Sequence, residues 1–350
     1  MIVILDSPTP LTLICRFRQP PMLPLLRRLL LPALVHTIPL TLAAQVPVAQ
    51  RLDTAHVNVA SRVDTSAKAL RSMTVMDRRE IDGRAARSVA DVVGWGLGVD
   101  LMPRSAAQAD LAIRGSSFEQ VVVLVDGVRV SDDQTGHFDL DLAVPLALVE
   151  RVEVLRGSGS AIYGPDAVGG VVNIVTRGGA TARAGLAGTT SGRGGSFGTA
   201  GLAGTLTRGS PGSGLTLGVE HERSDGHRAD TDYRVTQARA SAARAVGTGT
   251  LSLDLGVGVR DFGAADFYAP QPSHERTRSG TAALRWKAPL ADGWSLSATT
   301  SGRRHDDRFT LRRDDPGFYQ NEHTLLQAGT ELVARGPAAG GVTLAVGGEG

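Results

Sequence analysis

The stretch VERVEVLRGSGSAIYGPDAVGGVVNIVTRGG, residues 149–179, decides the fold of this protein. It begins as a β-strand and runs into a Gly-x-Gly turn, which is also how a dinucleotide-binding unit begins. Such a unit needs a third glycine and a helix that opens there, so that free N–H groups face a phosphate. Here Ile162 stands where the third glycine belongs, and Pro165 and Gly169-Gly170 disfavour a helix. A second, valine-rich strand follows, so the stretch predicts strand, glycine-rich connection and strand.

The composition argues against several classes of function. The chain has 350 residues, of which 43 are glycine and only 4% are aromatic, which is unusual for a compact soluble enzyme. With a net charge of +2 and no long basic run, nucleic acid is not a predicted partner. Cys15 is the only cysteine, so a mature protein that loses its N-terminus has no disulfide and no thiolate metal site. We predict no cofactor.

The N-terminus has the features of a secretory signal peptide, which we assign to residues 1–44. Arg27-Arg28 precede an apolar run at residues 29–42, and the small residues Ala43-Ala44 follow it. Met22 is an alternative start, because residues 1–21 do not fit this pattern. Residues 45–62 are polar and irregular and predict a linker.

Residues 63–178 predict a globular α/β domain. Met73–Asp77 reads as a strand, and Ser88–Gly96 reads as a helix with Ser88 as its N-cap and glycine at its end. The runs DLAIRG and VVVLVDGVRV predict further strands, and Asp126-Gly127 predicts a tight turn inside the second run.

From residue 179 to residue 350 the pattern changes to strict alternation. In residues 251–260 five apolar residues share one face, and the other face carries Ser252, Asp254, Gly256, Gly258 and Arg260. Strands of about ten residues with one apolar face, joined by turns that are alternately short and long, are typical of a transmembrane β-barrel. A soluble β-sandwich also alternates and remains the alternative.

Several motifs in one order resemble the TonB-dependent outer-membrane receptors. They are AIRGSS at residues 112–117, VVVLVDGVRV at 121–130 and VEVLRGSGSAIYGPDAVGGVVNIVT at 152–176. The resemblance implies an α+β plug domain at 63–178, followed at 179–350 by antiparallel transmembrane β-barrel strands. It also implies a Gram-negative outer membrane as the location and contact with its lipid. The partner implied is TonB, the energy-coupling protein of the inner membrane.

A mobile segment that binds TonB, the TonB box, precedes the plug in this family. The similar segment here lies within the linker and comprises Leu52, Asp53, Thr54, Ala55, His56, Val57, Asn58 and Val59. An extended segment with alternating valines can add a strand to the edge of a partner's sheet. Family boxes more often have consecutive valines, whereas His56 and Asn58 interrupt them here.

The resemblance also suggests contact residues within the plug. Arg114 and Arg156 match arginines that pair with glutamates of the barrel wall in the family. An apical plug loop, which we define as residues 131–141, supplies the candidate ligand contacts Asp132, Gln134, Thr135, His137 and Phe138. Its carboxylates do not have EF-hand spacing, so we predict a solvated loop and no metal site.

The predicted activity is TonB-dependent uptake of a scarce organometallic nutrient. QTGH in the apical loop and residues 261–278 resemble the cobalamin-receptor branch, with a ferric siderophore as the alternative ligand. A surface protein that binds ligand without energy coupling is the alternative from another functional class.

Catalysis is not predicted, and the barrel is expected to be incomplete. GGSFG, residues 194–198, fits G-x-S-x-G, but without a following helix it predicts a glycine-rich hairpin. Plugged transporters of the outer membrane use about 22 strands. The residues after the plug leave room for about seven or eight, so we expect the N-terminal part of a receptor.

Overall fold

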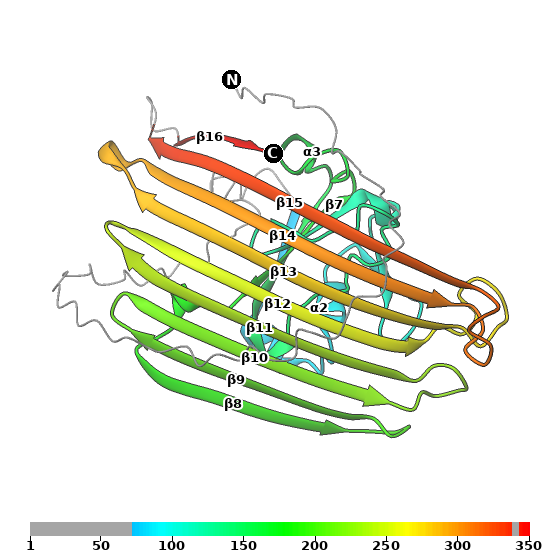
Figure 1. Cartoon of the computed structure of the whole chain (residues 1–350). Coiled ribbons are helices and arrows are strands. Elements are labelled where there is room, and N and C mark those ends of the chain that lie inside the picture. The colour runs from blue at the N-terminus through cyan, green and yellow to red at the C-terminus, as the bar shows by residue number, and fades with distance from the viewer. Residues whose placement is uncertain (1–71, 338–342) are drawn as a thin grey trace, which may run out of the picture.

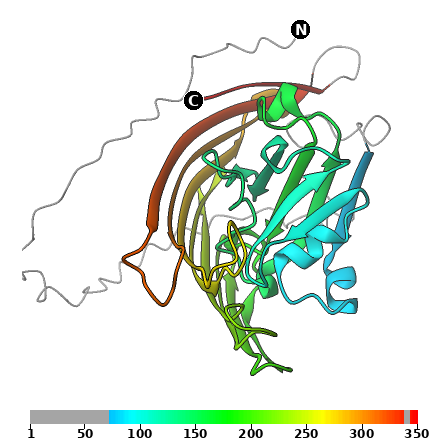
Figure 2. The same ribbon diagram turned by 90° about the vertical axis from the view of Figure 1, so that its right-hand side faces the viewer.

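The computed structural model describes residues 72–337 and 343–350, which form a small α+β domain against a long antiparallel sheet (Figure 1). We call the first part the plug and the long sheet the wall. In the view turned by 90°, the wall curves around one side of the plug (Figure 2). The predicted signal peptide and TonB box lie outside the described residues.

The plug is built on a five-stranded sheet with the strand order β1-β6-β7-β4-β5. All neighbours in it are antiparallel except β4 and β7, which are parallel. Three short α-helices, single 3-10 turns at Phe118–Gln120 and Leu146–Leu148, and a hairpin of β2 and β3 complete the described part of the domain. The bounds are β1 Ser72–Asp77, α1 Arg78–Gly83, α2 Val89–Gly94, β2 Val99–Pro103, β3 Ala109–Ile113, β4 Val121–Val125, β5 Val128–Arg129, β6 Val149–Arg156, α3 Ser160–Tyr163 and β7 Gly170–Thr176.

Local sequence signals account for most of these elements. Ser88 caps α2 through a capping box with Asp91, as its position before the apolar run predicts. The Asp126-Gly127 turn joins β4 to β5, with φ of 52° at Asp126 and 81° at Gly127. The buried valines of β4, β6 and β7 form the centre of the plug core.

The glycine-rich connection of residues 157–169 lies between two strands, as predicted. It also contains the one-turn helix α3, which the prediction missed because Pro165 and the glycines that follow it disfavour a longer helix. Gly157 and Gly164 have φ of 89° and 88°, where glycine avoids strain. At Gly170 a Cβ would overlap with the carbonyl of Leu155 on β6, so the close approach of these strands requires glycine.

The wall is a meander of nine antiparallel strands in chain order, one or two more than predicted. The extra strands fit although most strands exceed the predicted ten residues, because the turns at 211–212 and 247–248 have only two residues. The bounds are β8 Gly185–Gly194, β9 Ala200–Ser210, β10 Ser213–Ser224, β11 Tyr233–Val246, β12 Gly249–Gly263, β13 His274–Pro289, β14 Ser295–Thr310, β15 Gln320–Pro337 and β16 Thr343–Glu349.

The wall has its apolar face on the side away from the plug and its polar face toward the plug. In a soluble sandwich the apolar face is instead the buried one. On β12 the apolar residues point away from the plug, and Val257 is 60% exposed. Asp254 on the opposite face is buried. The apolar face is therefore the outer one, which decides for the barrel strands over the β-sandwich.

The connections of the wall are short at one end and long at the other. The long ones are 225–232, 264–273 and 311–319, and residues 195–199 close the predicted glycine-rich hairpin between β8 and β9. Among the residues that the structure describes, no helix has the length and apolar character needed to cross a membrane.

Candidate functional site at the plug and wall interface

Two buried carboxylates give the apical loop its shape. Asp132 accepts hydrogen bonds from the backbone N–H of Gln134 and of Thr135, both at 3.2 Å, and from the Thr135 hydroxyl at 2.6 Å. The N–H of Asp132 donates to Asp139 Oδ1 at 2.6 Å. Burial raises the pKa of Asp139 well above its ordinary range, although the bonded amide of Asp132 opposes this shift. The loop is thus folded by its own side chains.

This folding determines which predicted ligand contacts reach the surface. Gln134 is exposed, Thr135 and His137 are half-buried, and Asp132 and Phe138 are buried. Phe138 packs against His305 of the wall, with ring centroids 4.9 Å apart. Of the five, Gln134, Thr135 and His137 offer surface to a ligand in this conformation, and their role remains a prediction.

Arg104, in the loop between β2 and β3, connects the apical loop to the wall. Its Nη1 lies 3.0 Å from Nδ1 of His137, and that same ring nitrogen lies 3.0 Å from Asp110 Oδ1. The guanidinium also lies 4.7 Å from the ring centroid of Phe267 and 5.2 Å from that of Tyr268, both in loop 264–273. One cation thereby joins two plug loops to a long loop of the wall.

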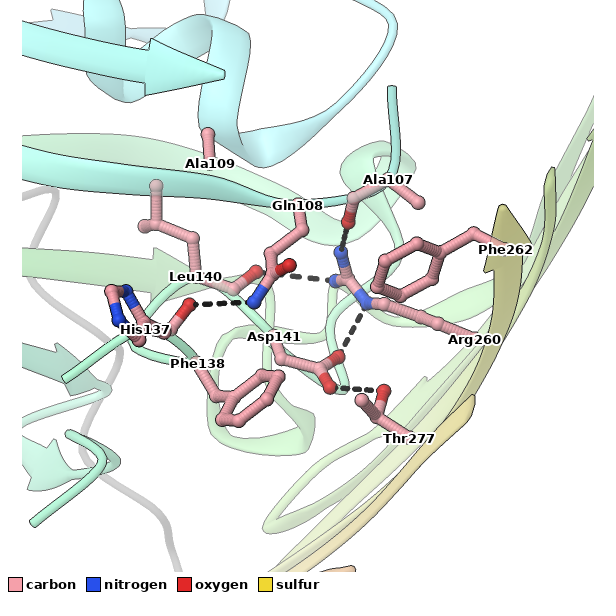
Figure 3. A pocket seen from close by; sticks show the side chains of 10 residues that line it. All are labelled: Ala107, Gln108, Ala109, His137, Phe138, Leu140, Asp141, Arg260, Phe262 and Thr277. Atoms are coloured by element: carbon pink, nitrogen blue, oxygen red, sulfur yellow. Dashed lines mark hydrogen bonds and ion pairs between the residues drawn. The ribbon is translucent and has the colours of Figure 1, made fainter. Parts of the chain in front are cut away.

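A cavity of about 10 Å³ lies beneath the apical loop, where plug and wall meet (Figure 3). Arg260 of β12 points into this region, donates to the carbonyl of Ala107 at 2.7 Å and forms an ion pair with Asp141. The hydroxyl of Thr277 donates to the same carboxylate. Gln108 Oε1 is buried here and has no hydrogen-bond partner within residues 72–337 and 343–350. The space suffices for a single water molecule, so this cavity is not a ligand pocket.

The wall presents further donors to the plug. Arg303 donates to the carbonyl of Ser131 at 3.1 Å, and Arg239 donates to Asp126 Oδ2 at 2.6 Å. Arg285 donates to the Asp126 carbonyl at 2.7 Å. The wall arginines therefore meet plug carboxylates and carbonyls, a polarity opposite to the predicted pairing of plug arginines with wall glutamates.

A smaller set of wall side chains accepts hydrogen bonds from the plug. Glu220 Oε2 accepts from the N–H of Leu146 at 2.8 Å, and Gln237 Oε1 accepts from the N–H of Val144 at 3.1 Å. These bonds satisfy backbone groups of the segment that leads into β6.

The two plug arginines singled out from the sequence lie together near Gly98. A Cβ at that glycine would be 3.5 Å from Cγ of Arg114 and 3.7 Å from Cδ of Arg156. Arg114 is exposed with φ of 55°, and Arg156 donates to the carbonyl of Leu97 at 3.2 Å. Their pairing with wall glutamates stays a prediction.

The sequence analysis missed the wall arginines as plug contacts, but a signal for them was present. Arg260 and Asp254 fall on the polar side of the alternating pattern in residues 251–260. A charged residue on the inward face of a barrel strand must meet water or the plug. The alternation predicts that these side chains face inward, but the plug groups that they contact are known only from the structure.

Comparison with known proteins identifies the plug. Residues 65–171 match the TonB-dependent Receptor Plug Domain family. Over 105 residues, 30% of this chain, the sequence is 37% identical to the "Vitamin B12 transporter BtuB" of Photobacterium profundum, of which the match covers 17%. Together with the outward apolar face of the wall, this places the chain in the outer membrane.

Solved structures with the same fold include siderophore receptors and the "Copper transporter OprC". The siderophore receptor PirA of Acinetobacter baumannii matches 79% of this chain with a TM-score of 0.63 and 17% identity. A mutant of the ferric enterobactin receptor of Pseudomonas aeruginosa matches 85% with a TM-score of 0.64 and 18% identity. The match covers 47% of the first structure and 50% of the second. The chain thus spans about half the length of these receptors.

Proposed function

We propose that this chain, which belongs to the TonB-dependent receptors, takes part in energy-coupled uptake of a nutrient across the outer membrane. The observation that carries the proposal is the seating of the plug. Its apical loop lies beside the long loops of the wall, and hydrogen bonds and ion pairs attach it to the inward face. A plug held by polar contacts can loosen without leaving the wall, whereas a continuous apolar core could not.

The proposed ligand is a cobalamin-like organometallic compound, because the relative with 37% identity is a vitamin B12 transporter by name. A ferric siderophore is the second candidate, because the receptors of similar fold named above are siderophore receptors. The half-buried His137 and Thr135 and the exposed Gln134 would contact either ligand from the plug side. No metal is assigned to the protein itself, because any metal would arrive within the ligand.

The test measures binding and uptake separately. Outer-membrane preparations that contain the protein are titrated with radiolabelled cyanocobalamin and with ferric enterobactin. Uptake of each is then followed in cells with and without TonB. We expect saturable cyanocobalamin binding and uptake that requires TonB. Binding of ferric enterobactin alone would make the siderophore the ligand, and binding of neither would refute both proposals.

Replacement of Val57 by proline tests the proposed TonB box. Proline removes an N–H that an added strand would donate to TonB, so we expect uptake to fall while binding is unchanged. The matched control is Val48→Pro, in the same linker but before the box. Undiminished uptake with Val57→Pro would refute the assignment of the TonB box, whereas ligand binding without any uptake in the wild type would favour the surface protein that binds without energy coupling.

A further inference from the structure

The Asp126-Gly127 turn is the point where the plug sheet is tied to the wall by charge. Oδ1 of Asp126 accepts from the N–H of Thr176 at 2.7 Å, and Oδ2 accepts from the Thr176 hydroxyl at 2.7 Å. The same Oδ2 accepts from Arg239 Nη2 on β11 at 2.6 Å. The carbonyl of Asp126 accepts from Arg285 Nη2 on β13 at 2.7 Å. One plug residue therefore joins β7 to two strands of the wall.

A second carboxylate, Asp254 on β12, lies between these two arginines on the wall itself. Its Oδ1 is 3.8 Å from Nη2 of Arg239, the same nitrogen that donates to Asp126. Its Oδ2 is 4.0 Å from Nη1 of Arg285. Both distances allow charge attraction but are too long for hydrogen bonds. Asp254 therefore lies close enough to attract both arginines, but in this conformation it accepts a hydrogen bond from neither of them.

The pairing of these four charged groups matters for stability because their side chains are largely buried. The side chain of Arg239 is only 5% exposed and that of Asp254 only 8%. No described residue is a hydrogen-bond partner of the buried Nε of Arg239, so within this part of the chain the guanidinium has a donor to spare. A buried charge that loses its partner is strongly destabilising. If Asp126 moved away, two wall arginines would remain, and Asp254 is the carboxylate placed to neutralise them.

We propose that Asp254 takes over Arg239 and Arg285 when Asp126 withdraws, so that the four charges form a reversible latch between plug and wall. Asp126 holds the latch closed through hydrogen bonds. Asp254 lowers the free energy of the open state, because it leaves the arginines with a counter-ion on the wall. This inference rests on the proposed function, since transport is what requires the plug to loosen from the wall.

The latch predicts effects of opposite sign for two similar substitutions. Asp126→Asn removes the plug charge and loosens the turn. Asp254→Asn removes the counter-ion of the open state, so the plug is held more tightly. Asp254→Glu keeps the charge and adds a methylene, which brings the carboxylate closer to the arginines and makes it a stronger competitor. It therefore loosens the turn as well.

Hydrogen–deuterium exchange measures this without any ligand. The reporters are peptides that contain the N–H groups of Gly127 and Thr176, which join the turn to β7 because their acceptors are the side chains of Asn173 on β7 and Asp126 in the turn. We expect about tenfold faster exchange with Asp126→Asn and with Asp254→Glu, and several-fold slower exchange with Asp254→Asn. The matched control is Asp261→Asn on the same strand, whose ion pairs are with His274 and Arg276 of the wall. It is expected to leave the reporters at the wild-type rate.

Faster exchange with Asp254→Asn would overturn the latch, because Asp254 would then only support the wall. If that variant does not assemble in the membrane, Asp254→Glu decides, and exchange at or below the wild-type rate overturns the proposal. Uptake assays keep the two proposals apart. Opposite-signed exchange without uptake would support the latch and refute transport, whereas uptake with equal exchange in all variants would do the reverse.

Discussion

Replacement of Arg260 by methionine should detach the apical part of the plug from the wall. Methionine keeps an unbranched stem of similar reach and removes the charge. In the structure Arg260 forms an ion pair with Asp141 and donates to three carbonyls, those of Ala107 at 2.7 Å, Leu140 at 3.2 Å and Leu142 at 3.4 Å. The side chains of Arg260 and Asp141 are 13% and 5% exposed, so the pair is largely removed from water.

The expected magnitude follows from this burial. Removing one partner of a buried ion pair costs about 3–5 kcal/mol, because the other charge is left uncompensated. The loss of the three hydrogen bonds to carbonyls adds less to this cost, because water in the neighbouring cavity can replace the arginine as a donor. About 3–5 kcal/mol corresponds to roughly a hundredfold to several thousandfold change in the equilibrium for local opening.

The assay is hydrogen exchange of the apical loop, where the N–H of Asp141 donates to the carbonyl of Phe138 at 3.0 Å. Arg276→Met is the matched control. It removes a wall arginine that is 43% exposed and 3.9 Å from Asp261, and a surface pair of this kind is worth about 0–1 kcal/mol. We expect fast exchange in Arg260→Met and nearly unchanged exchange in the control.

The pH dependence gives a second check on the same reasoning. Burial raises the pKa of Asp141, but Arg260 together with its other neighbours outweighs burial and holds this pKa below its ordinary value, with Arg260 making the largest of these contributions. The pair therefore stabilises the wild type at neutral pH, and this contribution is lost as pH falls through the lowered pKa. In Arg260→Met the buried carboxylate of Asp141 has lost the Arg260 cation. Protonation of Asp141 then removes the cost of a buried unpaired charge. The difference in exchange rate between the variant and the wild type should therefore shrink as pH falls.

A double substitution completes the test. Asp141→Asn in the Arg260→Met background removes the uncompensated charge and should restore much of the protection. The reasoning is refuted if Arg260→Met exchanges at the wild-type rate, or if the double variant opens as readily as Arg260→Met does.

Two further predictions concern the plug alone. Burial raises the pKa of Asp139 above its unfolded value, so its carboxyl group stabilises the loop less as pH rises toward the folded pKa. Asp139→Asn, which keeps an acceptor oxygen, should slow exchange of the apical loop at pH 7 but not at pH 4; equal effects at both would contradict this. Gly170→Ala places a Cβ on a carbonyl of the neighbouring strand and should cost about 1–3 kcal/mol in thermal or urea unfolding. Gly280→Ala, whose Cβ would meet nothing within 4 Å, is its control, and equal losses would refute the steric argument.

The sequence predicted those elements of the plug that depend only on a few neighbouring residues. The Ser88 cap and the Asp126-Gly127 turn lie in their predicted places, because capping and turn formation depend on a few neighbouring residues. The helix α3 was missed because a single turn has no periodicity to detect. The number of wall strands was underestimated because two-residue turns shorten the connections.

The contacts between plug and wall could not be predicted in the same way. Arg260 and the Leu140 carbonyl are 120 positions apart in the chain, and their distance depends on how the whole plug docks. The alternation correctly placed Asp254 and Arg260 on the polar face, but it contains no information about the opposing surface. For the same reason the predicted ligand residues Asp132 and Phe138 turned out to be buried.

The high arginine content of the chain nevertheless fits the hydrogen-bond acceptors that the plug presents to the wall. Plug loops have carbonyls that no sheet partner satisfies, so the facing wall must supply donors. Arginine has five N–H groups in a rigid fork and can serve several acceptors at once, whereas lysine offers a single charged point. Arg260 reaches three carbonyls and a carboxylate from two plug segments. Of the 37 basic residues only Lys68 and Lys287 are lysines. The wall arginines Arg239, Arg260, Arg285 and Arg303 all donate to carbonyls or carboxylates of the plug, so this part of the wall binds protein groups and does not only line a water-filled channel.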